Sequence, residues 1–342
     1  MASDESSHFD QVRMQNRRIV RNLMRHFPQI SKAELAEVSG LSFPTVSALL
    51  SDLMQTGEVI LLPDSATRGG RPAEQFSLQA DFQTAVCAYI ENHELFLRVC
   101  DVLGHVRFES RQSLQAGQVP AQLSLYLQQQ KASYPQMSVV CLGIPGVVEN
   151  GVLTYIPEYP DLDGLPLQRD LERDLSLPVF LENDVNVFVS AERERWPSLV
   201  HIFNGANGAG AGILVNRQLI RGAGGYAGEL EYLPFIHNGQ PVTFCEKLRL
   251  IHQECPPDSG KNKDDLLTCL AQAIVSLICV INPPDVALSG FQLSDRDMDD
   301  LRIVLERIIP SARCPSLHVV EPVDDLYQGG LLEMAMDYWK SR

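Results

Sequence analysis

Apolar residues recur three or four positions apart at the start of the chain, which is the spacing of helices with one buried face. The stretch "NRRIVRNLMRHF" predicts one such helix, which Pro28 ends. A second helix is predicted in "SKAELAEVSG", because Ser31 and Glu34 have capping-box spacing and Gly40 suits a left-handed C-terminal cap. The chain therefore opens with two helices close together.

A third predicted helix follows almost at once, in "SFPTVSALLSDLMQTG". It begins at a serine, has a proline in its first turn and carries its apolar residues on one face. Two helices joined by a tight turn are typical of a helix-turn-helix, whose second helix enters the major groove of DNA, although a plain helical bundle is the alternative. The predicted DNA contacts at the start of this helix are Ser42, Pro44, Thr45 and Ser47.

Two short strands separated by a glycine-rich loop come next. The stretches "GEVILLP" and "AEQFSL" are predicted to pair, with "DSATRGGRP" between them. Arginines spaced by glycines can lie flat in a narrow minor groove, although a glycine-rich turn with incidental arginines is the other interpretation. Beside a helix-turn-helix, the loop indicates a DNA-binding wing, and residues 10–80 are predicted to be a winged helix-turn-helix domain. The predicted wing contacts are Arg68, Gly69, Gly70 and Arg71.

From residue 81 the pattern is that of an α/β protein. Strands are predicted in "TAVCAYI", "LFLRVCDVLGHV", "SVVCLGIPGVV" and "LPVFLEND", and a glycine-rich hairpin in "HIFNGANGAGAGILV". Long helices are predicted in "DDLLTCLAQAIVSLICVINP" and "GGLLEMAMDYWK". Two sheets flanked by helices fit this length better than one sheet.

The charge is uneven along the chain of 342 residues, whose net charge is −15. Residues 1–80 hold eight basic and nine acidic residues, so 20 basic and 34 acidic residues remain for the rest, a balance of −1 against −14. The acidic remainder excludes wrapping of nucleic acid by the whole surface. A local basic patch on the first helix is one reading of its arginines, and a solvated helix face is the other. These arginines are Arg13, Arg17, Arg18, Arg21 and Arg25.

The chain shows neither the pattern of a secretory leader nor an apolar run long enough for a membrane span, so we expect a cytoplasmic protein with no membrane partner. Its eight cysteines are scattered, several of them inside apolar runs, and none forms a CxxC pair. This pattern indicates buried thiols in a reducing compartment rather than a disulfide framework.

Several motifs together resemble the ROK family of repressors, open reading frames and sugar kinases, in its regulator branch. They are "GLSFPTVSALLSDLMQTGEV", "RGGRP", "GIPGVVENG", "LPVFLENDVN", "GAGAGILVNRQLIRGAGGYAGELEYLP" and "INPPDVALSG", and their order and spacing cover nearly the whole chain. The resemblance implies a two-lobed actin-like body, of the sugar kinase and ribonuclease H type, over residues 81–342. It also implies that the final helix packs back near the first lobe.

In the kinases of this family, the aspartate that matches Asp184 is the base that activates a sugar hydroxyl. Those kinases hold phosphate with an Asp-x-Gly-Gly-Thr turn, whereas this chain has "YIENH" there. Tyr89 replaces the acid, and Glu91 and Asn92 replace both glycines, where a glutamate would repel phosphate. The adenosine-side glycine pair is reduced to Ser289, Gly290 and Phe291, a phenylalanine that would fill space. We therefore expect no ATP binding, no kinase activity and no cofactor.

The sugar side of the resemblance is partly kept. Asn183, Asp184 and Glu229 match the family's hydroxyl-binding residues, and carboxylates and amides suit such ligands. Glu158 stands where the family commonly has an asparagine, and Tyr232 where it has a histidine. We expect these five residues to form the effector site, although Asn183 and Asp184 could instead cap the helix that follows them.

The family's structural zinc site is not expected in this chain. That site combines the missing histidine with three closely spaced cysteines, whereas this chain offers only Cys245, with His237 and His252 nearby. One thiolate with two histidines makes no tetrahedral set without help.

These observations favour a sugar-responsive transcriptional regulator, specifically a repressor of carbohydrate genes that reads a palindromic operator as a homodimer or dimer of dimers. Asp184 would then hold a ligand rather than catalyse. Two alternatives stay open: a sugar kinase with an accessory DNA-binding domain, and a regulator controlled by a protein partner.

Overall fold

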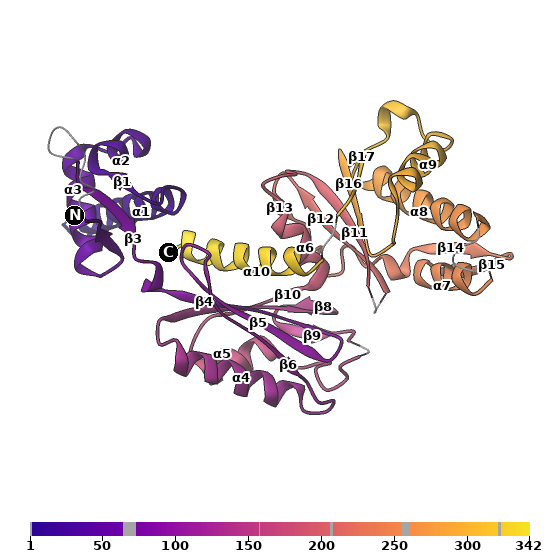
Figure 1. Ribbon diagram of the computed structural model, residues 1–342, viewed down its shortest axis with the longest axis horizontal. Coiled ribbons are helices and arrows are strands. Elements are labelled where there is room, and N and C mark those ends of the chain that lie inside the picture. The colour runs from indigo at the N-terminus through magenta and orange to yellow at the C-terminus, as the bar shows by residue number, and fades with distance from the viewer. Residues whose placement is uncertain (1, 64–72, 157, 206–207, 255–259, 321–322) are drawn as a thin grey trace.

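The computed structural model describes residues 2–63, 73–156, 158–205, 208–254, 260–320 and 323–342. Three parts follow one another along the chain: an N-terminal head, a first lobe and a second lobe (Figure 1). The two lobes form the body, and each has a sheet at its centre. The predicted α/β architecture with two sheets is confirmed, and each of these sheets has five described strands. Within the described residues, no helix has the length and apolar character that a membrane span requires.

The head consists of three helices and a small antiparallel sheet in the order β1-β3-β2. Its second helix begins at the predicted capping box, where Ser31 N donates to Glu34 Oε2 at 2.8 Å and Glu34 N donates to Ser31 Oγ at 3.3 Å. It ends at Gly40, whose φ of 68° is left-handed as predicted. The elements are α1 (Ala2–His26), β1 (Ile30–Ser31), α2 (Lys32–Ser39), α3 (Phe43–Gln55), β2 (Val59–Leu61) and β3 (Gln75–Leu78).

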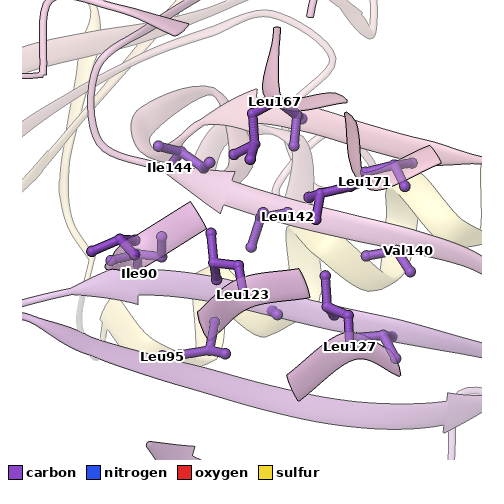
Figure 2. Packing of buried hydrophobic residues seen from close by; sticks show 14 of the residues in the cluster. Ile90, Leu95, Leu123, Leu127, Val140, Leu142, Ile144, Leu167 and Leu171 are labelled. Atoms are coloured by element: carbon purple, nitrogen blue, oxygen red, sulfur yellow. The ribbon is translucent and has the colours of Figure 1, made fainter. Parts of the chain in front are cut away.

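The first lobe is built on a sheet of order β10-β7-β4-β5-β6, in which β10, β7 and β4 are parallel and β5 and β6 antiparallel. Two helices cover one face through leucines such as Leu123 and Leu171, which meet Leu142 of β7 (Figure 2). A small hairpin, β8 (Val147–Glu149) and β9 (Val152–Thr154), follows β7. The other elements are β4 (Thr84–Glu91), β5 (Glu94–Asp101), β6 (Val106–Ser113), α4 (Val119–Ser133), β7 (Met137–Ile144), α5 (Leu167–Leu175) and β10 (Val179–Asn183).

The second lobe has a sheet of order β13-β12-β11-β16-β17, in which β11 and β12 pair as the predicted glycine-rich hairpin. Apolar residues of α7, α8 and α9 form its core against β11, β12 and β16. The elements are α6 (Asp184–Ala191), β11 (Leu199–Gly205), β12 (Gly208–Val215), β13 (Gln218–Leu219), β14 (Pro234–His237), β15 (Gln240–Thr243), α7 (Phe244–Glu254), α8 (Gly260–Val280), β16 (Asp285–Ser289), α9 (Asp295–Glu306) and β17 (Ser316–Val319).

The final helix, α10 (Val323–Lys340), runs from the junction of the lobes back along the first sheet, so that the C-terminus lies beside the head (Figure 1). Tyr327, Leu331, Ala335 and Trp339, four residues apart, pack against β4, β7 and α6 in a shared core. Gly330 allows the close approach, because a Cβ there would lie 1.9 Å from the carbonyl oxygen of Val187. The helix therefore contacts both the junction of the lobes and, at its far end, the head.

Candidate functional site

The start of α3 presents polar atoms to the surface. Ser42 and Pro44 are exposed, and Thr45 and Ser47 are half-buried. Ser42 Oγ accepts from Thr45 N at 3.3 Å and lies 2.7 Å from Thr45 Oγ1, so the two hydroxyls share a hydrogen bond. The apolar face of α3 is buried in the head, and its first turn is accessible at the surface. The predicted wing contacts Arg68, Gly69, Gly70 and Arg71 lie outside the described residues.

The arginines of α1 have specific partners, which neither sequence reading anticipated. Arg13 pairs with Asp52 of α3, and Arg17 and Arg21 both pair with the nearly buried Glu58. Arg18 donates to the backbone carbonyl of Ser341, and Arg21 Nη1 donates to that of Arg342 at 3.1 Å. The arginines thus hold α1 to the rest of the head and to the end of α10.

A pocket of about 1030 Å³, open mouth included, lies between the two lobes. Its walls come from the end of β4, the turn after β7, the start of α6, the β11–β12 hairpin and α10. Four of the five predicted effector residues line it, namely Glu158, Asn183, Asp184 and Glu229.

Asn183 caps α6. Its Oδ1 accepts from Val185 N at 2.9 Å and from Asn186 N at 3.2 Å, and its Nδ2 donates to Gly146 O at 3.0 Å. The capping interpretation of this residue is therefore confirmed. Because Asn183 also lines the pocket, the same bonds fix the orientation of the amide that a ligand would meet.

Asp184 is the first residue of α6, and its Oδ1 accepts from Val185 N at 2.8 Å. Burial, the largest influence, raises the pKa of Asp184 to about 7, and the charges of Glu229 and Glu91 push it in the same direction. The Val185 N–H and the Tyr327 hydroxyl act in the opposite direction. Asp184 is thus a carboxyl group that takes up a proton near neutral pH.

Glu182, behind Asp184, orients this turn and was missed from the sequence. Its Oε1 accepts from Asn186 Nδ2 at 2.9 Å and from Asn183 N at 3.1 Å, while its Oε2 accepts from Arg221 Nε at 2.8 Å. The i,i+4 spacing of Glu182 and Asn186 within "ENDVN" was the available signal. Arg221 is distant in sequence and could not have been found in this way.

Glu229 reaches the pocket because the segment before it lies against β12. Ala211 N donates to Gly228 O at 2.8 Å, and a Cβ on Gly228 would lie only 1.8 Å from Ala211 O. Tyr232, in contrast, does not line the pocket. Its ring is 41% exposed and lies 5.6 Å from the rings of both Tyr155, which does line it, and Tyr226. Tyr232 therefore belongs to an aromatic rim beside the opening.

The end of β4, where the sequence departs from the motif expected in the family's kinases, combines aromatic packing with a carboxylate. Tyr89 is stacked between Phe96 at 4.6 Å and Tyr327 at 4.0 Å, and its hydroxyl donates to Asp324 Oδ1 at 3.2 Å. Glu91 points its carboxyl group into the pocket wall, where burial and the charge of Asp324 raise its pKa although Arg111 lowers it. Such an arrangement opposes binding of an anion.

The segment predicted to replace the adenosine-side glycines packs within the second lobe. Ser289 is buried, and its Oγ lies 2.7 Å from His201 Nε2. Phe291 is 8% exposed and packs in the second-lobe core, as the space-filling interpretation predicted. Gly290 is required there, because its φ is +76° and a Cβ would lie 2.1 Å from Asn204 O.

The candidate zinc residues have other partners. Cys245 Sγ accepts from Ala209 N at 3.2 Å, and His237 lies 2.7 Å from Glu254 Oε1 and 2.9 Å from Lys247 Nζ. Across the described part of the chain, no three His, Cys, Asp or Glu side chains gather as a metal site would require. The seven described cysteines are free.

Comparisons with known proteins show which family and which solved structures this chain is similar to. Residues 107–248 match the ROK family. The chain carries a ROK family domain. The xylose repressor of Caldicellulosiruptor bescii is 25% identical over 218 residues, which are 59% of this chain and 54% of that repressor. Matches to the first three curated relatives span 50 to 58% of their lengths, so this chain aligns with little more than half of each.

Two solved structures share the fold of this chain. A ROK family transcriptional regulator, described as a homologue of the Escherichia coli Mlc protein, superposes with a TM-score of 0.71 at 17% identity, covering 95% of this chain and 99% of that one. The ROK hexokinase of Thermus thermophilus superposes with a TM-score of 0.60 at 19% identity, covering 75% of this chain and 99% of the hexokinase. The two-lobed actin-like fold predicted from the sequence is therefore confirmed.

Proposed function

We propose that this protein is a DNA-binding transcriptional repressor whose interlobe pocket binds a carbohydrate that modulates repression. Residues 10–80 would be the DNA-binding domain and residues 81–342 the effector and dimerisation domain. Relatives named xylose repressor and repressor Mlc support this function, as does the superposed regulator. The protein would bind operator DNA as a homodimer or dimer of dimers, so that its symmetry matches a palindromic site.

The observation that carries the proposal is the accessible first turn of α3 in a head attached to a pocketed body. Ser42 and Pro44 are exposed, whereas the rest of the helix contributes Val46 and Leu50 to the core. A helix held by its apolar face and presenting a short polar first turn has the geometry with which recognition helices enter the major groove. We assign DNA contact to Ser42, Pro44, Thr45 and Ser47, and to the wing residues 68–71.

Selection of binding sequences from random duplex DNA by the purified chain tests this function. The expected product is a palindrome with half-sites about one or more helical turns apart, bound far more tightly than unrelated DNA. Binding of all duplexes with equal affinity, or of none, would contradict the proposal.

We further propose that the body is not a sugar kinase. Glu91 and the Phe96–Tyr89–Tyr327 stack occupy the turn at which phosphate would have to bind. Incubation of the protein with ATP, magnesium and common hexoses or amino sugars should yield no sugar phosphate above the background of protein-free samples. Turnover in the wild type that Asp184→Asn abolishes would support the kinase alternative instead.

The structure of α10 suggests how the pocket communicates with the head. Tyr327 lines the pocket and hydrogen-bonds Asp184, while the other end of the helix contacts Arg18 and Arg21 of α1. A change at Asp184 could thereby alter the packing of one rigid helix against both sites. The relay implies an energetic coupling between the two ends of α10, which hydrogen exchange can measure.

A further inference from the structure

The charge of the interlobe pocket has one sign. Five carboxylates line it, contributed by both lobes, whereas the described lining residues include no Lys, Arg or His. These carboxylates are Glu91, Glu158, Asp184, Glu229 and Glu231. Neutral sugars need a few acceptors of this kind, but five in one cavity exceed what hydroxyl recognition requires and repel one another.

The carboxylates act on one another and have few compensating cations. Burial and the charges of Glu229 and Glu91 raise the pKa of Asp184, and burial raises that of Glu229. Two arginines beside the pocket have ion-pair partners of their own: Arg111 pairs with Glu94, although its charge also lowers the pKa of Glu91, and Arg221 pairs with Glu182. The pocket therefore holds negative charge that a cation would stabilise.

A second feature, independent of the carboxylates, points to the same ligand chemistry. Tyr155, Tyr226 and Tyr232 form an aromatic rim beside the opening, with ring centroids 5.6 Å apart in successive pairs. Tyr155 lines the pocket itself, and Tyr226 lies between the lining residues Gly225 and Ala227. Aromatic faces attract cations and also stack on the apolar faces of sugar rings.

We propose that the effector of this pocket is a carbohydrate bearing a protonated amine, that is, an amino sugar whose nitrogen is not acylated. This proposal rests on the proposed function and names its ligand class. The ammonium group would lie among Glu91, Asp184 and Glu229, where it forms charge-assisted hydrogen bonds. The remaining carboxylates and the Asn183 amide would meet ring hydroxyls.

Three sugars with the same ring test the proposal, namely glucosamine, N-acetylglucosamine and glucose, which differ only in the substituent at carbon 2. Calorimetric titration of the full chain at neutral pH should give roughly tenfold or tighter binding of glucosamine over both others, because charged hydrogen bonds exceed neutral ones. The preference should shrink as salt is raised. Equal or tighter binding of glucose or N-acetylglucosamine would overturn the proposal.

Variants separate the role of charge from that of shape. Glu91→Gln and Glu229→Gln keep the side-chain size and should each reduce the preference for glucosamine to within a few-fold, while the exposed Glu306→Gln of α9 should leave it unchanged. Two pocket variants are used in case one of them misfolds, and circular dichroism shows whether each is folded. A preference that survives both pocket substitutions would overturn the proposal. Putrescine, an amine without hydroxyls, should bind more weakly than glucosamine, and tighter binding would exclude a carbohydrate.

The same preparations distinguish this inference from the proposed function. Each is also titrated with the DNA selected above. If the chain binds the selected DNA but prefers neutral sugars, only the proposed amine-bearing effector is contradicted. The proposed function as a transcriptional repressor then stands. Loss of all sequence-specific DNA binding contradicts the proposed function, and the effector assignment then fails with it even if glucosamine binds.

Discussion

The Nε atom of Arg21 lies 2.5 Å from Oε2 of Glu58, and this ion pair ties α1 to the start of the head sheet. Glu58 is only 5% exposed and also accepts from Arg17. Through its other nitrogens, Arg21 reaches the backbone of Arg342 beyond α10. A single carboxylate therefore orients both Arg17 and Arg21, and Arg21 also joins the head to the body.

Glu58→Gln should destabilise the head by about 2 to 4 kcal/mol, because it leaves two partly buried guanidinium groups without a charged partner. Hydrogen exchange of α1 and β2 measures this locally, which suits a chain with several domains. The exposed Glu37→Gln of α2 is the matched control and should change exchange little. Equal exchange in both variants would contradict the assigned role.

The stabilisation by Glu58 should also depend on pH. Burial alone would raise the pKa of Glu58, but hydrogen bonds and charge from Arg21 outweigh it and lower the pKa below the unfolded value of 4.5. The unfolded chain therefore takes up a proton first as the pH falls. The contribution is fully present above pH 4.5 and is lost below it, so the difference in exchange between wild type and Glu58→Gln should narrow in acid.

Asp184 should show the opposite dependence. Its pKa of about 7 in the folded protein exceeds the unfolded value of 3.8, so the folded state holds a proton that the unfolded state releases between these values. Stability should fall as the pH rises through this window. Asp184→Asn should therefore stabilise the second lobe more at pH 8 than at pH 5, by about 1 to 3 kcal/mol.

Urea unfolding at the two pH values measures this difference, with the exposed Asp299→Asn of α9 as a control expected to show none. If Asp184→Asn changed stability by the same amount at both pH values, the carboxyl group would not be protonated in the folded state. The same variant should weaken binding of any effector by about 1 to 3 kcal/mol, since a charged acceptor is lost.

Gly228→Ala should remove the pocket geometry rather than a ligand contact. The glycine has a φ of +96°, and a Cβ would lie 1.8 Å from Ala211 O. Gly239→Ala is the matched control, because that glycine has a similar φ of +78° but nothing within 4 Å of an added Cβ. The control should cost about 1 to 2 kcal/mol, the left-handed penalty, and Gly228→Ala clearly more. Equal thermal stability of the two variants would mean that β12 moves away from the added Cβ without an energetic cost.

Local features of the fold could be read from the sequence, whereas partnerships between distant segments could not. The Ser31 capping box and the Gly40 cap depend on neighbours within four residues, and the structure has both. Tyr89 was recognised as a departure, but its stacking on Tyr327 joins positions far apart in the chain. The one-sided charge of the pocket likewise required knowing that Glu91 and Glu229 face one space.

The arginines of α1 illustrate the same limit. Their helical spacing was visible, yet spacing cannot say whether a guanidinium meets phosphate, water or a carboxylate. Glu58 lies in the turn before β2 and becomes their partner only when α1 packs across the head. Tyr232 was placed by its match to a histidine of the family, but the backbone at that point turns the ring to the rim.

The relay through α10 predicts a difference between two arginines of the same helix. Arg18 contacts the backbone of Ser341, whereas Arg13 pairs with Asp52 inside the head. Binding of the selected DNA should slow hydrogen exchange at the end of α10 in wild type and in Arg13→Ala, but not in Arg18→Ala. Because coupling between two sites is reciprocal, any influence of the effector on DNA binding should also be lost in Arg18→Ala. If DNA binding slowed exchange in Arg18→Ala as much as in wild type, α10 would not connect the head with the pocket.

Substitutions at the start of α3 and in the wing should change DNA binding in different ways. The minor groove presents A·T and T·A pairs alike, so Arg71 should add affinity and a preference for narrow A/T-rich flanks. Arg71→Ala should weaken binding and lower the salt slope by about one unit, with little change in the preferred major-groove bases. Arg296→Ala on α9 removes the same charge far from the head and should leave the slope unaltered.

Thr45 and Ser47 should instead set base preference, because they lie in the first two turns of α3 next to the exposed Ser42 and Pro44. Thr45→Ala also removes the partner of the Ser42 hydroxyl, so part of its loss should come from a weaker cap and appear as lower head stability. Ser47→Ala lacks that effect and isolates the contact. Titrations at several salt concentrations, on the operator and on variants of its flanks and half-sites, separate these contributions. An equal loss on every sequence for Ser47→Ala, with a reduced salt slope, would show that the start of α3 binds the DNA backbone and that its bases are read elsewhere.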